Sequence, residues 1–169
     1  AGGKILQYVD DNWKMMRKMR PAKSVDESAG GIRFMDFTQA KQTVLSELQG
    51  VFDTVDEKQI VELTEMICSA EKVFVVGVGR VLLMLQAFTK RLNHLGIEAN
   101  FVGAIDEPAI TDKDLLIVGS GSGTTASLVS DCKKAKAQKA IIATLTICPE
   151  APIGEMADAI ITIPGATQK

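Results

Sequence analysis

The residues best suited to chemistry in this chain form the run 119–125, GSGSGTT, called here the serine-rich loop. Its glycines let the backbone turn sharply and bring several N–H groups toward one point, and its serines and threonines add hydroxyl donors. A short apolar run precedes it and a helical pattern over 126–137 follows, so the loop lies at the positive end of a helix dipole. This arrangement predicts a phosphate site. The alternative is a flexible turn that binds nothing.

A second loop, Gly77-Val78-Gly79-Arg80, follows the apolar run 73–76. In a doubly wound sheet of strand order 2-1-3-4-5, strands 1 and 3 are neighbours, and the loops after them diverge at one crevice. We therefore expect Gly79 and Arg80 to face the serine-rich loop. A dinucleotide site is disfavoured, because Leu82 replaces the third glycine of GxGxxG and no acidic residue ends the second predicted strand. The expected ligand is a compact phosphorylated molecule.

The elements that must position these loops alternate between strand and helix patterns. Helical periodicity over 81–95 and 126–137 separates short, continuous apolar runs, which is typical of a parallel sheet covered by helices on both faces. The predicted strands are residues 73–76, 100–102, 115–118, 140–145 and 159–163. The sequence therefore predicts an α/β fold, a doubly wound five-stranded parallel sheet of the flavodoxin-like type.

Further helices are predicted ahead of the sheet. Apolar residues at helical spacing cover 38–52 and 57–70, and Asp56 is a suitable N-cap for the second helix. The helix over 81–95 is expected to bury the stripe Met84, Leu85, Phe88, Leu92 and Leu95. In residues 1–36 a short amphipathic stripe precedes the linker-like segment PAKSVDESAGG. We expect an N-terminal helical extension and linker there, docked on a partner subunit or poorly ordered, and one domain over 37–169.

Composition and charge exclude several classes of partner. The chain has 169 residues with 19 basic and 21 acidic side chains, and its net charge of -2 provides no electrostatic footprint for nucleic acid or an anionic membrane. It has no apolar run of about 18 residues and no signal-peptide pattern, so we expect no membrane contact and a cytoplasmic location. Its three cysteines are far apart and form no CxxC pair. They predict reduced thiols and no metal site.

Three segments taken together resemble sugar isomerase (SIS) domains, and most closely the 6-phospho-3-hexuloisomerases. They are the run GVGRVLLMLQAFTKRLNHLG over 77–96, the serine-rich loop, and LTICPEAPIG over 145–154. The similarity extends over roughly residues 37–169. It implies a SIS fold and the interconversion of 3-hexulose 6-phosphate and fructose 6-phosphate through an enediol, without a cofactor or metal. It also implies a homodimer or homotetramer whose crevices lie near subunit boundaries.

The resemblance assigns roles to residues of both loops. It implies that Ser120, Ser122 and Thr125 hold the phosphate and that backbone N–H groups over 121–124 assist. The complete set from this loop is Ser120, Gly121, Ser122, Gly123, Thr124 and Thr125, with Gly79 and Arg80 on the facing wall. His94, the only histidine, matches the histidine of the family's RLxHLG segment and would open the sugar ring or transfer a proton. A helix cap is the alternative for His94.

The chain departs from the family's pattern at three places. Val81-Leu82 stands where the family has Ser-Gly, and Ala104 stands where it commonly has glutamate. The glutamate expected as the family's base lies in a C-terminal segment that we expect this chain to lack. Glu107 and Glu150 are the candidate substitutes, and solvated loop carboxylates are the alternative for both. A non-catalytic sugar-phosphate-binding domain, either a sensor or a degenerate isomerase, therefore stands beside the isomerase as a second hypothesis.

Overall fold

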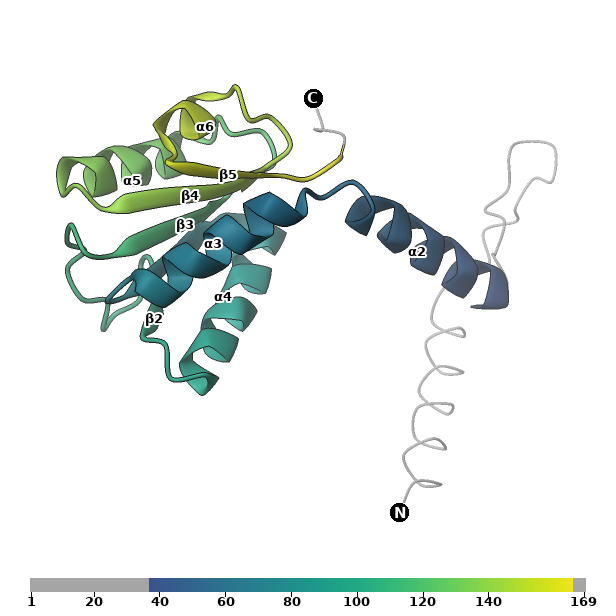
Figure 1. Cartoon of the computed structure of the whole chain (residues 1–169), viewed down its shortest axis with the longest axis horizontal. Helices are drawn as coiled ribbons and strands as arrows, with labels where there is room; N and C mark the ends of the chain where they lie inside the picture. The colour runs from purple at the N-terminus through teal and green to yellow at the C-terminus, as the bar shows by residue number, and fades with distance from the viewer. Residues whose placement is uncertain (1–36, 166–169) are drawn as a thin grey trace, which may run out of the picture. The chain divides into compact units, whose positions relative to one another are not determined.

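The computed structural model describes residues 37–165 and shows an α/β fold (Figure 1). Its elements are α2 (Phe37–Phe52), α3 (Glu57–Ser69), β1 (Val73–Gly77), α4 (Gly79–His94), β2 (Ala99–Phe101), β3 (Leu115–Gly119), α5 (Ala126–Ala137), β4 (Ile141–Thr146), α6 (Pro152–Met156) and β5 (Ala159–Thr162). None of these helices combines the length and hydropathy needed to cross a membrane. The chain divides into two compact units, Ala1–Gln42 and Thr43–Lys169. The predicted extension and linker at 1–36 lie outside the described residues.

The five strands form one parallel sheet in the order β2-β1-β3-β4-β5. This order confirms the predicted doubly wound fold. Helices α3 and α4 pack on one face of the sheet, and α5 and α6 pack on the other (Figure 1). The strand order reverses beside β1, so the crevice that such a sheet offers to a ligand lies where the carboxyl ends of β1 and β3 meet.

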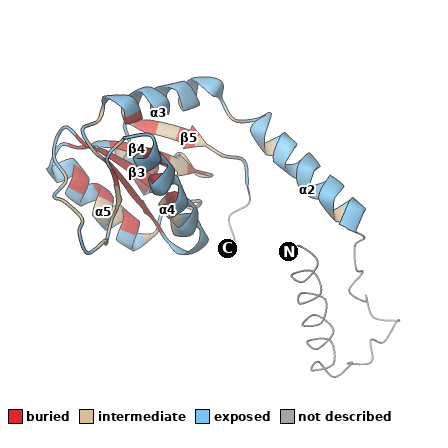
Figure 2. Ribbon diagram, turned by 90° about the horizontal axis from the view of Figure 1, so that it is seen from below, coloured by how far each residue is buried: buried red, intermediate tan, exposed pale blue. Residues whose placement is uncertain are grey.

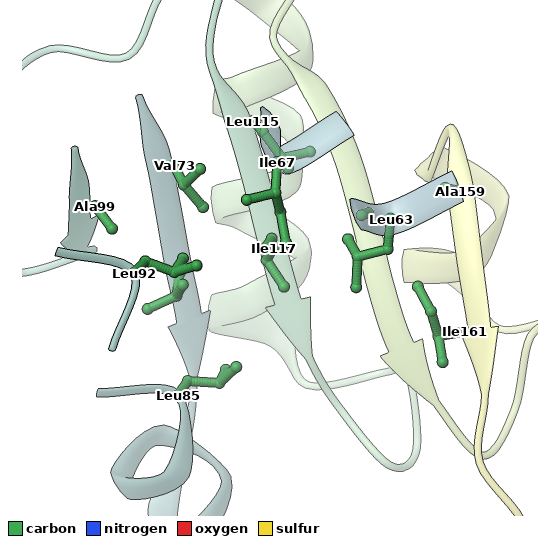
Figure 3. Close-up of a cluster of buried hydrophobic side chains, with 12 residues drawn as sticks. Leu63, Ile67, Val73, Leu85, Leu92, Ala99, Leu115, Ile117, Ala159 and Ile161 are labelled. Carbon is green, nitrogen blue, oxygen red and sulfur yellow. The ribbon is translucent and has the colours of Figure 1, made fainter. Parts of the chain in front are cut away.

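Strands β1 and β3 form the centre of the core, because every residue in them is buried. Successive side chains of a strand point to opposite faces. Val75 therefore joins the cluster under α3 and α4, whereas Phe74 joins the cluster under α5. In Figure 3, which shows the first cluster, the two covering helices contribute Leu63, Ile67, Leu85 and Leu92. Both loops of the predicted site thus follow the strands whose residues are all buried.

The buried face of α4 is narrower than its apolar pattern predicts. Leu85 and Leu92 are buried as expected, but Met84 and Leu95 are 68% and 77% exposed. The third buried residue is Thr89, whose hydroxyl donates to the Leu85 carbonyl at 2.9 Å and so needs no further partner. Helix α2 likewise has apolar residues at helical spacing, yet none of its residues is buried (Figure 2). The periodicity of apolar residues located these helices correctly. It overestimated the number of apolar side chains that each helix buries.

Helix ends show one confirmed prediction and one omission. Asp56 is the N-cap of α3, and its carboxylate accepts a hydrogen bond from the Lys58 N–H at 2.9 Å. The short helix α6 was not predicted. It begins at Pro152, whose ring already holds the backbone in a helical φ. Its five residues cover less than two turns, too few for a period to be recognised.

Stability should depend on pH above neutrality through Cys132 of α5. Burial, aided by the neighbouring Asp131, raises the pKa of this thiol from 9.0 to about 11. Between these values the unfolded chain releases the proton and the folded chain keeps it. The free energy of unfolding is therefore expected to fall as the pH rises from 9.0 to about 11. Urea midpoints measured across this range test the prediction, and an equally steep fall in Cys132→Ala would contradict it.

Candidate functional site

Two glycines end the adjacent strands at the centre of the carboxyl edge. Gly77 of β1 and Gly119 of β3 are paired in register, and α4 packs directly on them. A Cβ atom on Gly119 would lie 2.5 Å from Cγ1 of Val81 and 2.9 Å from Cδ1 of Leu85, closer than side chains approach one another. The absence of side chains on these residues therefore lets α4 begin immediately above the edge of the sheet.

Gly79 and Arg80 lie where β1 passes into α4. Gly79 has a φ of 56°, a left-handed conformation that suits glycine. Arg80 is exposed in the first turn of the helix, and within residues 37–165 its guanidinium forms no ion pair. A cation at a helix N-terminus is unfavourable by itself. Because β1 and β3 are neighbours, Arg80 starts from the same sheet edge as the serine-rich loop, where an anion would compensate it.

Hydrogen bonds within the serine-rich loop give it a defined shape. Ser120 is buried, and its hydroxyl oxygen accepts from the Gly123 N–H at 3.1 Å. That bond leaves the hydroxyl proton of Ser120 available to a ligand. The hydroxyl oxygens of Ser122 and Thr124 lie 3.2 Å apart, and the Thr124 N–H points toward the same Ser122 oxygen at 3.4 Å. The structure therefore brings the hydroxyls of Ser122 and Thr124 together and ties that of Ser120 to the backbone of the same loop.

The loop continues into the N-terminus of α5. Thr125 is the N-cap residue, but its side chain makes no capping hydrogen bond, and the first turn contains no acidic residue. The N–H groups of that turn and the positive end of the helix dipole are therefore not neutralised by the helix's own residues. Together with the hydroxyls of Ser122, Thr124 and Thr125, they provide the donors that a phosphate group requires.

The end of β4 and the segment that follows it hold the serine-rich loop from its other side. The Ser120 N–H donates to the Leu145 carbonyl at 3.0 Å. The carbonyls of Gly121 and Gly123 accept from the N–H groups of Ile147 and Ile153, each at 3.1 Å. These partners belong to the run 145–154, and the resemblance of that run to SIS domains was the only signal of its importance. The connection from β4 to α6 thus forms part of the site.

His94 is not brought to the serine-rich loop of its own chain. It is exposed in the last turn of α4, and this helix runs from the carboxyl edge of the sheet to the amino edge. Gly79 and His94 are the two ends of its 16 residues, a rise of roughly 22 Å. The predicted catalytic role of His94 stays a prediction, and it now requires the crevice of a second copy of the chain.

The two candidate carboxylates have different surroundings. Glu107 turns back on its own loop, where its Oε2 accepts from the Gly103 N–H at 2.8 Å. Glu150 is exposed and precedes Ala151, whose Cβ lies against Gly123. Of the two, Glu150 is therefore the carboxylate on the segment that holds the serine-rich loop. Between residues 37 and 165, no three His, Cys, Asp or Glu side chains come together as a metal site would require.

Comparison with known proteins identifies the family. Residues 66–169 match the SIS domain. The chain is 40% identical over 132 residues to the 3-hexulose-6-phosphate isomerase of Bacillus subtilis, covering 78% of this chain and 71% of that protein. It is 37% identical over 142 residues to the enzyme of that name from Mycobacterium gastri, covering 83% and 71%. A solved structure from Methanococcus jannaschii has 3-hexulose-6-phosphate isomerase as its inferred molecular function. It is 33% identical to this chain with a TM-score of 0.68, and the match covers 77% of this chain and 76% of the chain in that structure. The predicted resemblance is confirmed, and this chain belongs to the SIS domain family.

Proposed function

We propose that this protein is a sugar-phosphate isomerase that interconverts 3-hexulose 6-phosphate and fructose 6-phosphate. Its similarity to proteins named 3-hexulose-6-phosphate isomerase, at 37–40% identity over most of the chain, supports this reaction. The structural observation that carries the proposal is the serine-rich loop at the start of α5. Its hydroxyls and the N–H groups at the uncapped start of α5 follow the carboxyl end of β3, beside the point where the strand order reverses and where such sheets bind ligands.

The chemistry is a proton transfer between neighbouring carbons. A base removes the proton from the carbon beside the carbonyl, an enediol forms, and the proton returns at the former carbonyl carbon. No net oxidation or reduction takes place. The phosphate lies remote from the reacting carbons, so its binding to Ser120, Ser122, Thr124 and Thr125 orients the sugar rather than taking part in the transfer. Arg80 on the facing wall adds a positive charge for the same anion.

Two further roles belong to this proposal. Glu150 is the candidate base, because it lies on the segment that contacts the serine-rich loop, whereas Glu107 is engaged by the Gly103 N–H. His94 acts within a homodimer or homotetramer, on a sugar held by another subunit. The exposed apolar side chains on α4, Leu83 and Met84 among them, support such an assembly.

The double substitution Ser120→Ala/Ser122→Ala tests the phosphate assignment. Loss of two hydroxyls that bond a charged group is expected to weaken fructose 6-phosphate binding by about 1–3 kcal/mol and to lower kcat/KM correspondingly. Calorimetric titration and an isomerisation assay measure the two quantities. Ser130→Ala, on an exposed position of the following helix, is the matched control.

Three outcomes distinguish the hypotheses. Isomerisation by the wild-type protein, reduced in the double variant and retained in the control, supports the proposal. Binding of fructose 6-phosphate without isomerisation would identify a non-catalytic sugar-phosphate-binding domain instead. Unchanged affinity in the double variant would remove the serine-rich loop from the site.

A further inference from the structure

Two carbonyl groups of the serine-rich loop point away from the proposed ligand. The Gly121 carbonyl accepts from the Ile147 N–H, and the Gly123 carbonyl accepts from the Ile153 N–H. In a trans peptide the carbonyl and the following N–H point in opposite directions. Holding these two carbonyls on the segment after β4 therefore turns the N–H groups of Ser122 and Thr124 toward the opposite side, where the hydroxyls of the same two residues meet.

Thr146, the last residue of β4, lies at the centre of this anchorage. It is 1% exposed. Its hydroxyl oxygen accepts from the Cys148 N–H at 3.1 Å and lies 3.3 Å from the Gly121 carbonyl oxygen and 3.4 Å from that of Cys148. The single hydroxyl proton is thus placed between two carbonyls, and one of them belongs to the serine-rich loop. A Cβ on Gly123 would lie 3.6 Å from the same oxygen, so Gly121 and Gly123 are both beside it.

We propose that Thr146 is a positioning residue for the sugar phosphate. Its buried hydroxyl holds the Gly121 carbonyl against the segment after β4, and this aims the Ser122 N–H at the phosphate. Thr146 does not touch the ligand. The inference rests on the proposed function, because it assigns a purpose to the geometry of the same site.

Thr144 provides a closely matched control in the same strand. It is fully buried, and its hydroxyl donates to the Val118 carbonyl at 3.1 Å. The Thr144 hydroxyl therefore forms a hydrogen bond with the backbone of β3, whereas the Thr146 hydroxyl forms one with the loop that follows β3. The two residues differ in what they hold: Thr144 contacts the regular sheet, and Thr146 contacts the serine-rich loop.

The experiment compares Thr146→Val, Thr146→Ser and Thr144→Val by calorimetric titration with fructose 6-phosphate and by isomerisation kinetics. Thr146→Val keeps the shape of the side chain and removes the hydroxyl. It is expected to raise the dissociation constant and KM about tenfold, with a smaller change in kcat, because one misaligned hydrogen bond to a phosphate corresponds to about that factor. Thr146→Ser keeps a hydroxyl for the Gly121 carbonyl and is expected to bind fructose 6-phosphate within about twofold of wild type. Thr144→Val does not disturb the Gly121 carbonyl and is expected to bind within the same range.

Each alternative result overturns the inference in a recognisable way. Wild-type affinity in Thr146→Val would show that the hydroxyl does not position the loop, and would leave the proposed function intact. An equal loss in Thr144→Val would show a general loosening of the sheet. If wild-type protein binds no fructose 6-phosphate, both the inference and the proposed function fail. Should the valine variant not fold, Thr146→Ala makes the same comparison without a methyl group in place of the hydroxyl.

Discussion

Replacing Gly123 with alanine is expected to weaken fructose 6-phosphate binding by about a hundredfold or more. Gly123 has a φ of 64°, which is strained for any residue with a Cβ atom. The added Cβ would also lie 2.5 Å from the Cβ of Ala151 and 3.3 Å from the Cys148 carbonyl oxygen. The loop must therefore move away from the segment that holds it. This displaces the Gly123 carbonyl from the Ile153 N–H and misdirects the Thr124 N–H.

Gly96→Ala separates the backbone strain from the steric contact. Gly96 has a φ of 82°, but a Cβ there would meet nothing within 4 Å, and it follows α4 at the opposite edge of the sheet. This variant is expected to lose about 1–2 kcal/mol of stability and to retain its affinity. Calorimetric titration and urea unfolding of both variants measure these effects. Equal affinity in the two variants would show that contact with Ala151 does not shape the loop.

Asp114→Ala is expected to reduce the free energy of unfolding by roughly 3–5 kcal/mol. Asp114 is fully buried at the start of β3. Its carboxylate accepts from the N–H groups of Lys72 and Thr111 at 3.1 and 2.7 Å and from the Thr111 hydroxyl at 2.9 Å, with Lys72 Nζ 3.8 Å away. Alanine would leave these donors without their acceptor. Since they tie the loop before β3 to the start of β1, the two central strands would lose a shared anchor.

Asp131→Ala is the control for the effect of burial. Asp131 also forms a short ion pair, at 3.0 Å to Lys134, but that lysine side chain is 74% exposed. An exposed pair contributes little, so this variant is expected to lose less than about 1 kcal/mol. Urea unfolding of both variants tests the difference. A loss in Asp114→Ala as small as that in Asp131→Ala would show that buried donors at the start of the sheet find other acceptors.

The strands were predictable because their signal is local. Each apolar run expected as a strand lies within one residue of the observed bounds at both ends. A strand buried on both faces needs apolar residues at nearly every position, and that requirement is visible within three to six consecutive residues. The serine-rich loop was predictable for a similar reason, since its glycines and hydroxyls are adjacent in the sequence.

The covered side of each helix was less predictable. Met84 of α4 and Leu95, which caps this helix, belong to the apolar pattern and remain exposed, while Thr89 is buried. A helical period shows that apolar residues share a face, but the width of the contact depends on how the helix crosses the sheet. Here the glycines at 77 and 119 bring the start of α4 close to β1 and β3, and the buried line follows Leu85, Thr89 and Leu92.

The residue types along the chain were sufficient to predict the parallel α/β fold, the glycine turns and the hydrogen-bond donors of the serine-rich loop. Backbone freedom, hydroxyl groups and apolar runs are properties of neighbouring residues. Contacts between distant residues were needed for the rest of the site. The hydroxyl of Thr146, at the end of β4, lies beside the carbonyl of Gly121, 25 positions earlier in the loop after the neighbouring strand β3. The direction of α4 places His94 at the opposite edge of the sheet from the serine-rich loop of the same chain. Such contacts arise only when the strands pair and the helices pack, so no local pattern reports them.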